Sequence, residues 1–308
     1  MQKKYKHLLK IIVSLAILVA IFLKVGVKET LVHLKNADLV FILLIICLQI
    51  ITLLLGAFNI FILAKKMKKE LKFMSILKDY LIIWPIGLFF PSKLSDVGMV
   101  YLLKKRDIEV GKAVAAMIVD NTITLWVIAL FSLIGIYAFY GSTGAIVASV
   151  LIVAGMILGA ILVSPYATDF VKRVILKKKA VYFKGFSRGL AELEEDKGII
   201  LVNTFLTVLK LMSIFFTYYL AFLAINKAVA FSQVIQVTSI SRLATLLPIT
   251  INGLGLKEGI AIYLFNILGV AGSVVLSASL IVTITTYVAA PITFLVSSLI
   301  KGDQEKKE

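Results

Sequence analysis

Two stretches of the chain decide how it folds: Pro91-Ser92-Lys93-Leu94-Ser95-Asp96-Val97-Gly98 and Pro248-Ile249-Thr250-Ile251-Asn252-Gly253-Leu254-Gly255. Each interrupts a hydrophobic segment near its middle, residues 73–103 in the first case and residues 234–271 in the second. Proline removes a backbone donor and glycine loosens the chain, so such a break leaves polar groups that lipid cannot satisfy. Each break is therefore expected to face protein or water, and each half-segment is too short to cross a bilayer alone.

The composition places these segments in a membrane. Of 308 residues, 60% are hydrophobic and 16% are charged, and the mean hydropathy is +1.02. Soluble domains are typically about 45–50% apolar and about 25% charged, so a water-soluble globular protein is excluded. Six segments have the length and apolarity of full crossings: 8–24, 38–64, 113–139, 143–163, 199–225 and 273–300. The sequence predicts an all-α polytopic membrane protein with one transmembrane domain over residues 1–308.

The charges predict the orientation of the chain. Lys and Arg number 33 against 17 Asp and Glu, a net charge of +16. Most of the basic residues lie in the two terminal segments and in the loops at 65–72, 104–112 and 165–198. Because Lys and Arg accumulate on cytoplasmic loops, these loops and both termini are predicted to be cytoplasmic in a multi-pass protein of the cell membrane. The positive charge is thereby explained without nucleic acid, which is not an expected partner.

This orientation holds only if each broken segment returns to the side from which it came. The segments 73–103 and 234–271 are therefore predicted to be re-entrant helical hairpins, and the alternative is two kinked full spans. Three full crossings separate them, so the first hairpin enters from the cytoplasm and the second from the outside. This is an inverted-topology repeat, in which interrupted segments indicate a transport site near the midplane. The residues that break the hairpins are Pro91, Gly98, Pro248, Gly253 and Gly255.

Charged residues inside apolar segments locate the candidate site, because they are costly at membrane depth unless they face a cavity or one another. Both breaks carry a basic and an acidic residue together, and Arg242 precedes the second break. With turn amides and half-helix N-termini nearby, such groups suit a phosphate or another anion. The alternative is that each pair only neutralises itself. The candidate substrate-binding residues are Lys93, Asp96, Arg242, Asn252, Lys257 and Glu258.

Three further residues are candidates for lining the transport path or coupling it to protons. Asp120 and Asn121 follow eight residues into their crossing, and Lys210 falls near the middle of the 199–225 crossing. The alternative reading is that Lys210 only pairs with Asp120 in a neighbouring helix. The sequence has no Walker loop, no HExxH motif and no Rossmann fingerprint, so no enzymatic activity, metal or cofactor is expected.

At its two breaks the chain resembles the integral membrane domain of lysylphosphatidylglycerol synthetases, the flippase domain of the multiple peptide resistance factor, which also occurs in stand-alone form. The resemblance covers roughly residues 10–300. The family's motif near Pro-Gly-Arg-Leu-Gly-Glu is similar to residues 91–96, with serines in place of both glycines. Its second motif closely matches residues 248–259. The family's Glu-Arg pair corresponds to Asp120-Asn121, where the arginine is missing.

The resemblance implies movement of a polar-headed lipid between leaflets, and the leading hypothesis is a lipid flippase or scramblase. Its expected partners are membrane lipids with an anionic or phosphate-containing headgroup. A homodimer and a separate lipid-modifying enzyme are left open as further partners. One alternative is a secondary transporter of a small ion or metabolite. The least favoured is a membrane enzyme that acts on a lipid-linked phosphate, because no acidic cluster of metal-site spacing is present.

Overall fold

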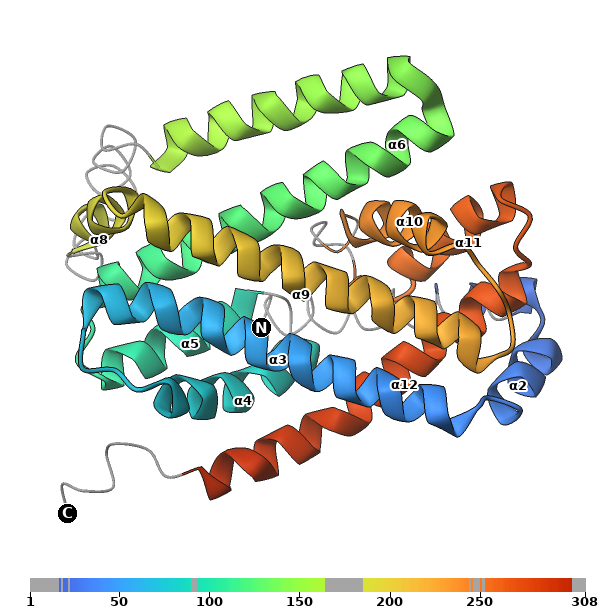
Figure 1. The fold of residues 1–308 in the computed structure, drawn as a ribbon, viewed down its shortest axis with the longest axis horizontal. Coiled ribbons are helices and arrows are strands. Elements are labelled where there is room, and N and C mark those ends of the chain that lie inside the picture. The colour runs from blue at the N-terminus through green and yellow to red at the C-terminus, as the bar shows by residue number, and fades with distance from the viewer. Residues whose placement is uncertain are drawn as a thin grey trace, which may run out of the picture.

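The computed structural model describes residues 17, 19–21, 23–89, 93–163, 185–243, 245, 250 and 253–300. Every named element in this part of the chain is a helix, which confirms the all-α prediction (Figure 1). The elements are α2 Val27–Lys35, α3 Leu39–Met67, α4 Phe73–Phe89, α5 Lys93–Lys105, α6 Val110–Val163, α8 Phe186–Glu194, α9 Lys197–Ala224, α10 Phe231–Leu243, α11 Leu256–Ile267 and α12 Gly272–Leu299.

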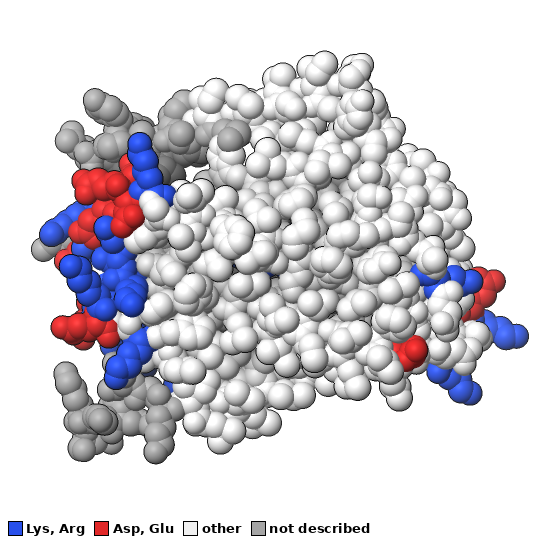
Figure 2. All heavy atoms as spheres, in the orientation of Figure 1, with Lys and Arg blue, Asp and Glu red and all other residues white. Residues whose placement is uncertain are grey.

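Four helices of the described chain are long and apolar enough to cross a membrane: α3, α6 up to Gly155, α9 and α12. Their outward side chains are hydrophobic, as with Leu201, which is 71% exposed, and Leu295, which is 65% exposed. Figure 2 shows Lys, Arg, Asp and Glu gathered at two opposite ends of the visible face, with an uncharged surface between them. An apolar exterior between two charged ends is the surface that a bilayer requires.

The helix α6 reverses direction at Gly141. This residue has φ 66° and ψ −164°, a backbone conformation that glycine adopts without a steric penalty. Figure 1 shows the two arms of α6 running back along each other from this corner. The crossings expected at 113–139 and 143–163 correspond to these two arms. The crossing expected at 8–24 lies mostly outside the described residues.

Each broken segment consists of two short helices. The pair α4 and α5 packs together at the end of the molecule where α8 lies, and the pair α10 and α11 packs together at the opposite end, near α2 (Figure 1). The prolines at 91 and 248 lie outside the described residues.

Two apolar clusters hold these pairs. One contains Ile76 and Ile83 of α4 with Leu103 of α5, and α3 contributes Ile60 to it. The other contains Val234, Val237, Leu264 and Phe265 of the α10–α11 pair, packed on α9 and α12. Burial of these side chains provides the hydrophobic driving force for docking each pair. Residues of both clusters, together with several polar side chains, line the space between them.

Polar bridges join the long helices in this middle zone. Asn59 of α3 donates a hydrogen bond to Thr207 of α9 (3.0 Å), and Thr52 donates one to Ser213 (3.0 Å). Such bonds fix the register of helices that otherwise contact each other through interchangeable apolar side chains.

Candidate functional site

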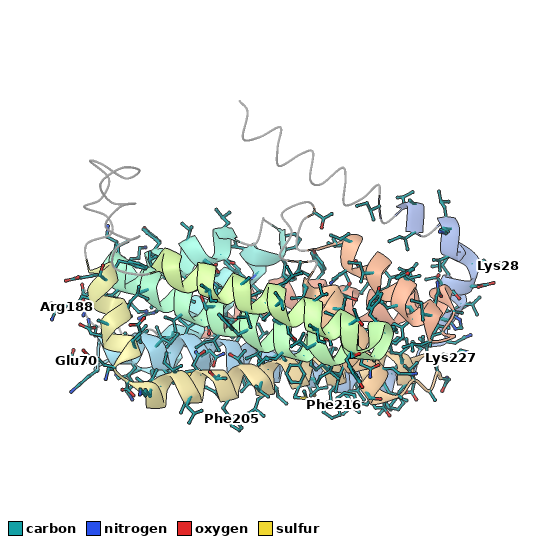
Figure 3. All side chains as sticks on the ribbon, turned by 90° about the horizontal axis from the view of Figure 1, so that it is seen from above. Lys28, Glu70, Arg188, Phe205, Phe216 and Lys227 are labelled. Atoms are coloured by element: carbon teal, nitrogen blue, oxygen red, sulfur yellow. The ribbon has the colours of Figure 1, made fainter. Side chains whose placement is uncertain are left out.

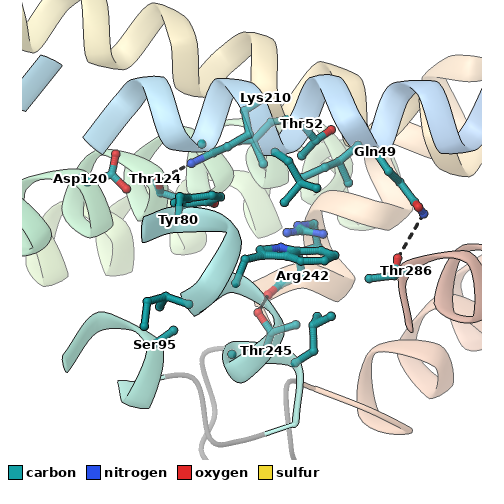
Figure 4. A pocket seen from close by; sticks show the side chains of 18 of the residues that line it. Gln49, Thr52, Tyr80, Ser95, Asp120, Thr124, Lys210, Arg242, Thr245 and Thr286 are labelled. Atoms are coloured by element: carbon teal, nitrogen blue, oxygen red, sulfur yellow. Dashed lines mark hydrogen bonds between the residues drawn. The ribbon is translucent and has the colours of Figure 1, made fainter. Parts of the chain in front are cut away.

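A cavity of about 430 Å³ lies between the two apolar clusters (Figure 4). Its walls come from α3, α4, α5, α6, α9, α10, α11 and α12. Ile60 and Ile83 belong to the cluster around the first broken segment and Val282 to the cluster around the second. A cavity of this size is typical of sites that hold a small ligand or a headgroup.

The structure brings most of the candidate residues to this one cavity. Residues of both broken segments line it, and so do the three residues predicted to line or couple the path. The six candidates on its wall are Asp96, Asp120, Asn121, Lys210, Arg242 and Lys257. Their roles in binding or coupling stay predictions.

The other candidates lie near the cavity or outside the described residues. Glu258 is buried directly behind Lys257. Lys93 begins α5, but its side chain lies outside the described part of the chain, as does all of Asn252. Gly98 packs against Ile83 of α4, and a Cβ atom there would meet the end of the Ile83 side chain.

The glycines of the second break adopt backbone conformations that other residues rarely reach. Gly253 has φ 74° and Gly255 has φ 83°, in the left-handed region that favours glycine. A Cβ atom on Gly253 would also collide with Thr245. This turn ends at α11, where the Glu258 carboxylate accepts a hydrogen bond from the N–H of Gly255 (2.7 Å). Lys257 Nζ lies 3.5 Å from the same carboxylate, so the predicted basic and acidic pair is formed.

The two aspartates of the cavity are held by amide side chains. Asn121 Nδ2 donates to Asp96 Oδ2 (2.9 Å), which joins α6 to α5. Asn203 Nδ2 donates to Asp120 Oδ1 (3.2 Å), and this joins α9 to α6. Both contacts use a neutral amide as the donor to the carboxylate.

Lys210 does not form the ion pair with Asp120 that was the alternative to a role in the path. Its Nζ atom donates to Thr124 Oγ1 of α6 at 3.4 Å, and Thr124 lies one helical turn beyond Asp120. In Figure 4 Lys210 points from α9 toward Thr124 and Tyr80. The ammonium group of Lys210 therefore lines the cavity instead of being neutralised by Asp120.

Arg242, like Lys210, lines the cavity without an acidic partner among the described residues. Its Nε atom is buried there without a hydrogen-bond partner. The end of α10 places it on the cavity wall, and Thr245 Oγ1 donates to its carbonyl oxygen (2.7 Å). Figure 4 shows the guanidinium group inside the cavity, between Gln49 and Thr245. A buried guanidinium without a carboxylate is costly unless an anion binds it.

The neutral polar residues of the cavity were not predicted from the sequence. Gln49 and Thr52 of α3, Tyr80 of α4, Thr124 of α6 and Thr286 of α12 all lie on its wall. Gln49 was visible as a rare amide inside a long apolar run, which is the signal that could have found it. A glycine at position 56 leaves space for the Tyr80 ring, because a Cβ atom there would collide with its hydroxyl group.

A second feature that the sequence did not predict is a buried ion pair, called the clamp, which joins the end of α5 to α4 of the first broken segment. Arg106, at the end of α5, donates through Nε to Asp79 Oδ2 (2.6 Å) and through an Nη atom to Asp79 Oδ1 (2.9 Å). The same guanidinium donates to the carbonyl oxygen of Ser75 (2.9 Å). This bidentate contact fixes α5 against α4 on the side away from the cavity.

We call one charged end of the molecule the basic end. It contains this clamp, α8 and the start of α6. Figure 3 shows Glu70 and Arg188 there, Lys28 and Lys227 at the opposite end, and Phe205 and Phe216 on the apolar surface between. Lys66 donates a hydrogen bond to Asp196 (2.8 Å), which caps α9. This bond, together with the N–H of Ile199, holds the pKa of the Asp196 carboxyl below its ordinary value of 3.8.

Comparison with known proteins agrees with the motifs at the two breaks. The family model described as lysylphosphatidylglycerol synthase TM region matches residues 7–292, which confirms the resemblance predicted from the sequence. A UPF0104 membrane protein of Methanothermobacter thermautotrophicus (strain Delta H) is 27% identical over 130 residues. That alignment covers 42% of this chain and 37% of the relative, so the chain matches little more than a third of the relative's length.

Proposed function

Because the chain belongs to the lysylphosphatidylglycerol synthase TM region family, we propose that it is a flippase or scramblase that moves a lipid with a polar or charged headgroup between the leaflets of the cell membrane. One observation carries the proposal. The cavity between the two apolar clusters joins Asp96 of the first broken segment to Arg242 and Lys257 of the second. Charged groups from both halves thus line one cavity.

In this proposal the α4–α5 and α10–α11 pairs are re-entrant hairpins. The basic end faces the cytoplasm with both termini, and the chain crosses the bilayer six times. The opposite placement of the two pairs in Figure 1 is what an inverted repeat requires. The apolar surface between the charged ends in Figure 2 supports a bilayer around the middle of the molecule.

The mechanism follows from the cost of moving charge through hydrocarbon. A phosphate or ammonium group crosses lipid slowly because its hydration is lost without replacement. Fixed groups of both signs in the cavity replace that hydration, while the acyl chains stay in lipid. Arg242, Lys257 and Lys93 bind phosphate oxygens, Asp96 and Glu258 orient those cations, and Asp120, Asn121 and Lys210 line the path. The step involves no covalent chemistry, so the chain acts as a transporter and not as an enzyme.

The proposal is tested by leaflet accessibility in liposomes. Purified protein is reconstituted with fluorescent phospholipids, and dithionite quenches only the outer leaflet. We expect the quenched fraction to rise well above the half found in protein-free vesicles, and we expect Arg242→Glu to abolish the rise while the protein remains folded in detergent. A quenched fraction near half for every lipid, with saturable uptake of a small anion into the same vesicles, would favour a secondary transporter instead.

A further inference from the structure

Asp120 belongs to a polar layer between the cavity and the basic end. Its carboxylate accepts a hydrogen bond from Asn203 Nδ2 of α9 (3.2 Å), and the same Nδ2 atom donates to the carbonyl oxygen of Asn59 of α3 (3.4 Å). Asn59 and Asn203 are completely buried, and Asp120 is 9% exposed. The long helices α3, α6 and α9 thus each contribute one polar side chain to this layer, and Asp120 is the one that reaches the cavity wall (Figure 4).

A group of apolar side chains closes this layer on the side of the basic end, and we call it the plug. Three of its members lie one helical turn from the polar residues and the fourth comes from α8: Leu63 of α3, Ala116 of α6, Ile199 of α9 and Leu193 of α8. Lys112 of α6 donates two hydrogen bonds (2.7 Å each) to Glu192, the neighbour of Leu193, and this ion pair holds α8 in place. Asp120 therefore faces the cavity on one side and an apolar barrier on the other.

The side-chain partner of Asp120 is the neutral amide of Asn203, and no Lys or Arg within the described residues forms an ion pair with it. Six other titratable residues share the cavity wall: Tyr80 of α4, Asp96 of α5, Lys210 and Tyr218 of α9, Arg242 of α10 and Lys257 of α11. The described parts of α3 and α12 add only neutral side chains to this wall. Beyond the plug, α8 carries Glu192, which Lys112 neutralises.

Lys210 is the group that can respond to the charge of Asp120. Its Nζ atom donates to Thr124 Oγ1 (3.4 Å), one helical turn from Asp120 on the same face of α6. One turn is about 5.4 Å, a shift that a long and flexible lysine side chain makes readily. A charged Asp120 attracts the ammonium group, whereas a protonated Asp120 leaves it free for a phosphate in the cavity. A proton on Asp120 and a phosphate at Lys210 thus favour each other's binding.

We propose that Asp120 binds a proton together with the lipid headgroup, so that a proton gradient drives lipid movement. This inference rests on the proposed function and adds its energy source. Asp120 takes the proton from water on the side where the headgroup enters and returns it to water on the side where the headgroup leaves. Proton and lipid therefore move in the same direction. Buried carboxyl groups serve as proton relays in many pumps and transporters, and here the plug keeps protons from crossing without lipid.

Extraction by albumin, which removes short-chain lipid from the outer leaflet only, measures the driven distribution. The full chain is reconstituted with short-chain fluorescent phosphatidylglycerol as a trace probe in phosphatidylcholine vesicles, and with the two lipids exchanged. Valinomycin with equal potassium on both sides sets the membrane potential to zero.

With the outside more acidic by one pH unit, we expect a brief extraction to remove well under half of at least one probe. One proton per lipid sets a limit of about tenfold more probe in the inner leaflet than in the outer, since one pH unit is a factor of ten in proton activity. Reversal of the gradient should raise the extracted fraction above half. The direction is the same for both orientations of the protein in the vesicle, because the gradient sets it.

Substitutions at position 120 assign the coupling to its carboxyl group. Asp120→Asn keeps the shape of the side chain but binds no proton, so the extracted fraction should stay at half under either gradient. Asp120→Glu keeps a carboxyl group and should keep the accumulation. Asp107→Asn, at an exposed carboxylate of the basic end, is the matched control and should behave as the wild type.

Two leucines of α8 test the plug. Leu193 is a member of it, whereas Leu190 is 6% exposed and packs against Ala115 and Phe186 in a separate cluster. With a pH-sensitive dye trapped in the vesicles, Leu193→Ser should acidify the interior severalfold faster than the wild type after an acid pulse outside. Leu190→Ser loses a leucine of the same helix and should acidify it no faster than the wild type.

The possible failures are distinct. If the wild type moves lipid in the dithionite assay but both probes stay evenly distributed under the gradient, the inference is overturned and the proposed function stands. If no lipid moves with or without a gradient, the proposed function fails and the inference fails with it. Accumulation by Asp120→Asn at the wild-type level, or loss of all movement in both Asp120→Asn and Asp120→Glu, overturns the role of Asp120 as the proton carrier. Equal acidification in Leu193→Ser and Leu190→Ser overturns the role of the plug.

Discussion

At the scale of single residues, the pair of Arg106 and Asp79 is expected to matter most for stability. The two side chains are 11% and 7% exposed, and each would be left as a buried charge without the other. Asp79→Ala should therefore lower the free energy of unfolding by about 3–5 kcal/mol. The measurement is unfolding in mixed detergent micelles titrated with sodium dodecyl sulfate, followed by circular dichroism.

An exposed ion pair nearby serves as the control. Lys68 lies 3.1 Å from Asp107, whose side chain is 84% exposed. Asp107→Ala should change the free energy of unfolding by about 1 kcal/mol or less. If Asp79→Ala has as small an effect as Asp107→Ala, the clamp between α4 and α5 is not a stabilising element.

Asp196 leads to a prediction about pH. Its pKa is lower in the folded protein than the ordinary 3.8, because Lys66 donates a hydrogen bond to the carboxylate. A carboxyl group with a lowered folded pKa stabilises the fold above its unfolded pKa, and the stabilisation is lost as the pH falls through the folded pKa. Lys66→Ala should thus have a lower melting temperature than the wild type above pH 3.8, and the difference should shrink in stronger acid. A difference that is constant across this range would contradict the assignment.

At the scale of elements, the contact between α6 and α10 depends on a glycine. The Cα of Gly135 lies so close to α10 that an added Cβ atom would collide with the carbonyl oxygen of Gln236. Gly135→Leu should push the two helices apart and cost about 1–3 kcal/mol, the usual penalty of overpacking. Gly155→Leu on the far arm of α6 is the matched control, because nothing lies within 4 Å of its added Cβ atom. Equal stability of the two variants would argue against this close packing.

The helices themselves were largely predictable from the sequence. Long apolar runs gave α3, α9 and α12 nearly to their ends, and the reversal of α6 followed from the polar Gly141-Ser142-Thr143. The two breaks were predicted because proline and glycine leave a local signal. The distribution of Lys and Arg along the whole chain was needed to predict which end of the molecule holds each pair of helices. The packing of α10 on α6 left no signal in the sequence.

The site was predictable only where it is charged. Asp96, Arg242 and Lys257 stand out inside apolar segments, and all three line the cavity. Thr124 did not stand out, since neutral polar residues are common in membrane helices for packing. Side-chain partners were not predictable either: a pairing of Lys210 with Asp120 was left open as an alternative, and the structure gives Thr124 and Asn203 as their respective partners. Side-chain pairing depends on helix rotation, which apolar runs do not specify.

At the scale of the whole molecule, the proposed orientation predicts which residues a reagent reaches. Glu70 lies at the basic end and Lys227 at the opposite end (Figure 3). In a Cys47→Ala background, Lys227→Cys should react with a membrane-impermeant maleimide added outside intact cells. Glu70→Cys should react only after permeabilisation. Labelling of both positions, or of Glu70→Cys alone, in intact cells would contradict the orientation.

In the proposed function a lipid headgroup passes through the cavity between the two broken segments, and a reversible block of that cavity tests this passage. Ser95 lines the cavity, whereas Ser298 is exposed near the end of α12. Each is changed to cysteine in the Cys47→Ala background and modified with a bulky cationic methanethiosulfonate. Modified Ser95→Cys should stop lipid movement in liposomes, reductant should restore it, and Ser298→Cys should transport throughout. Undiminished movement in fully modified Ser95→Cys, with modification established by mass spectrometry, would contradict the claim.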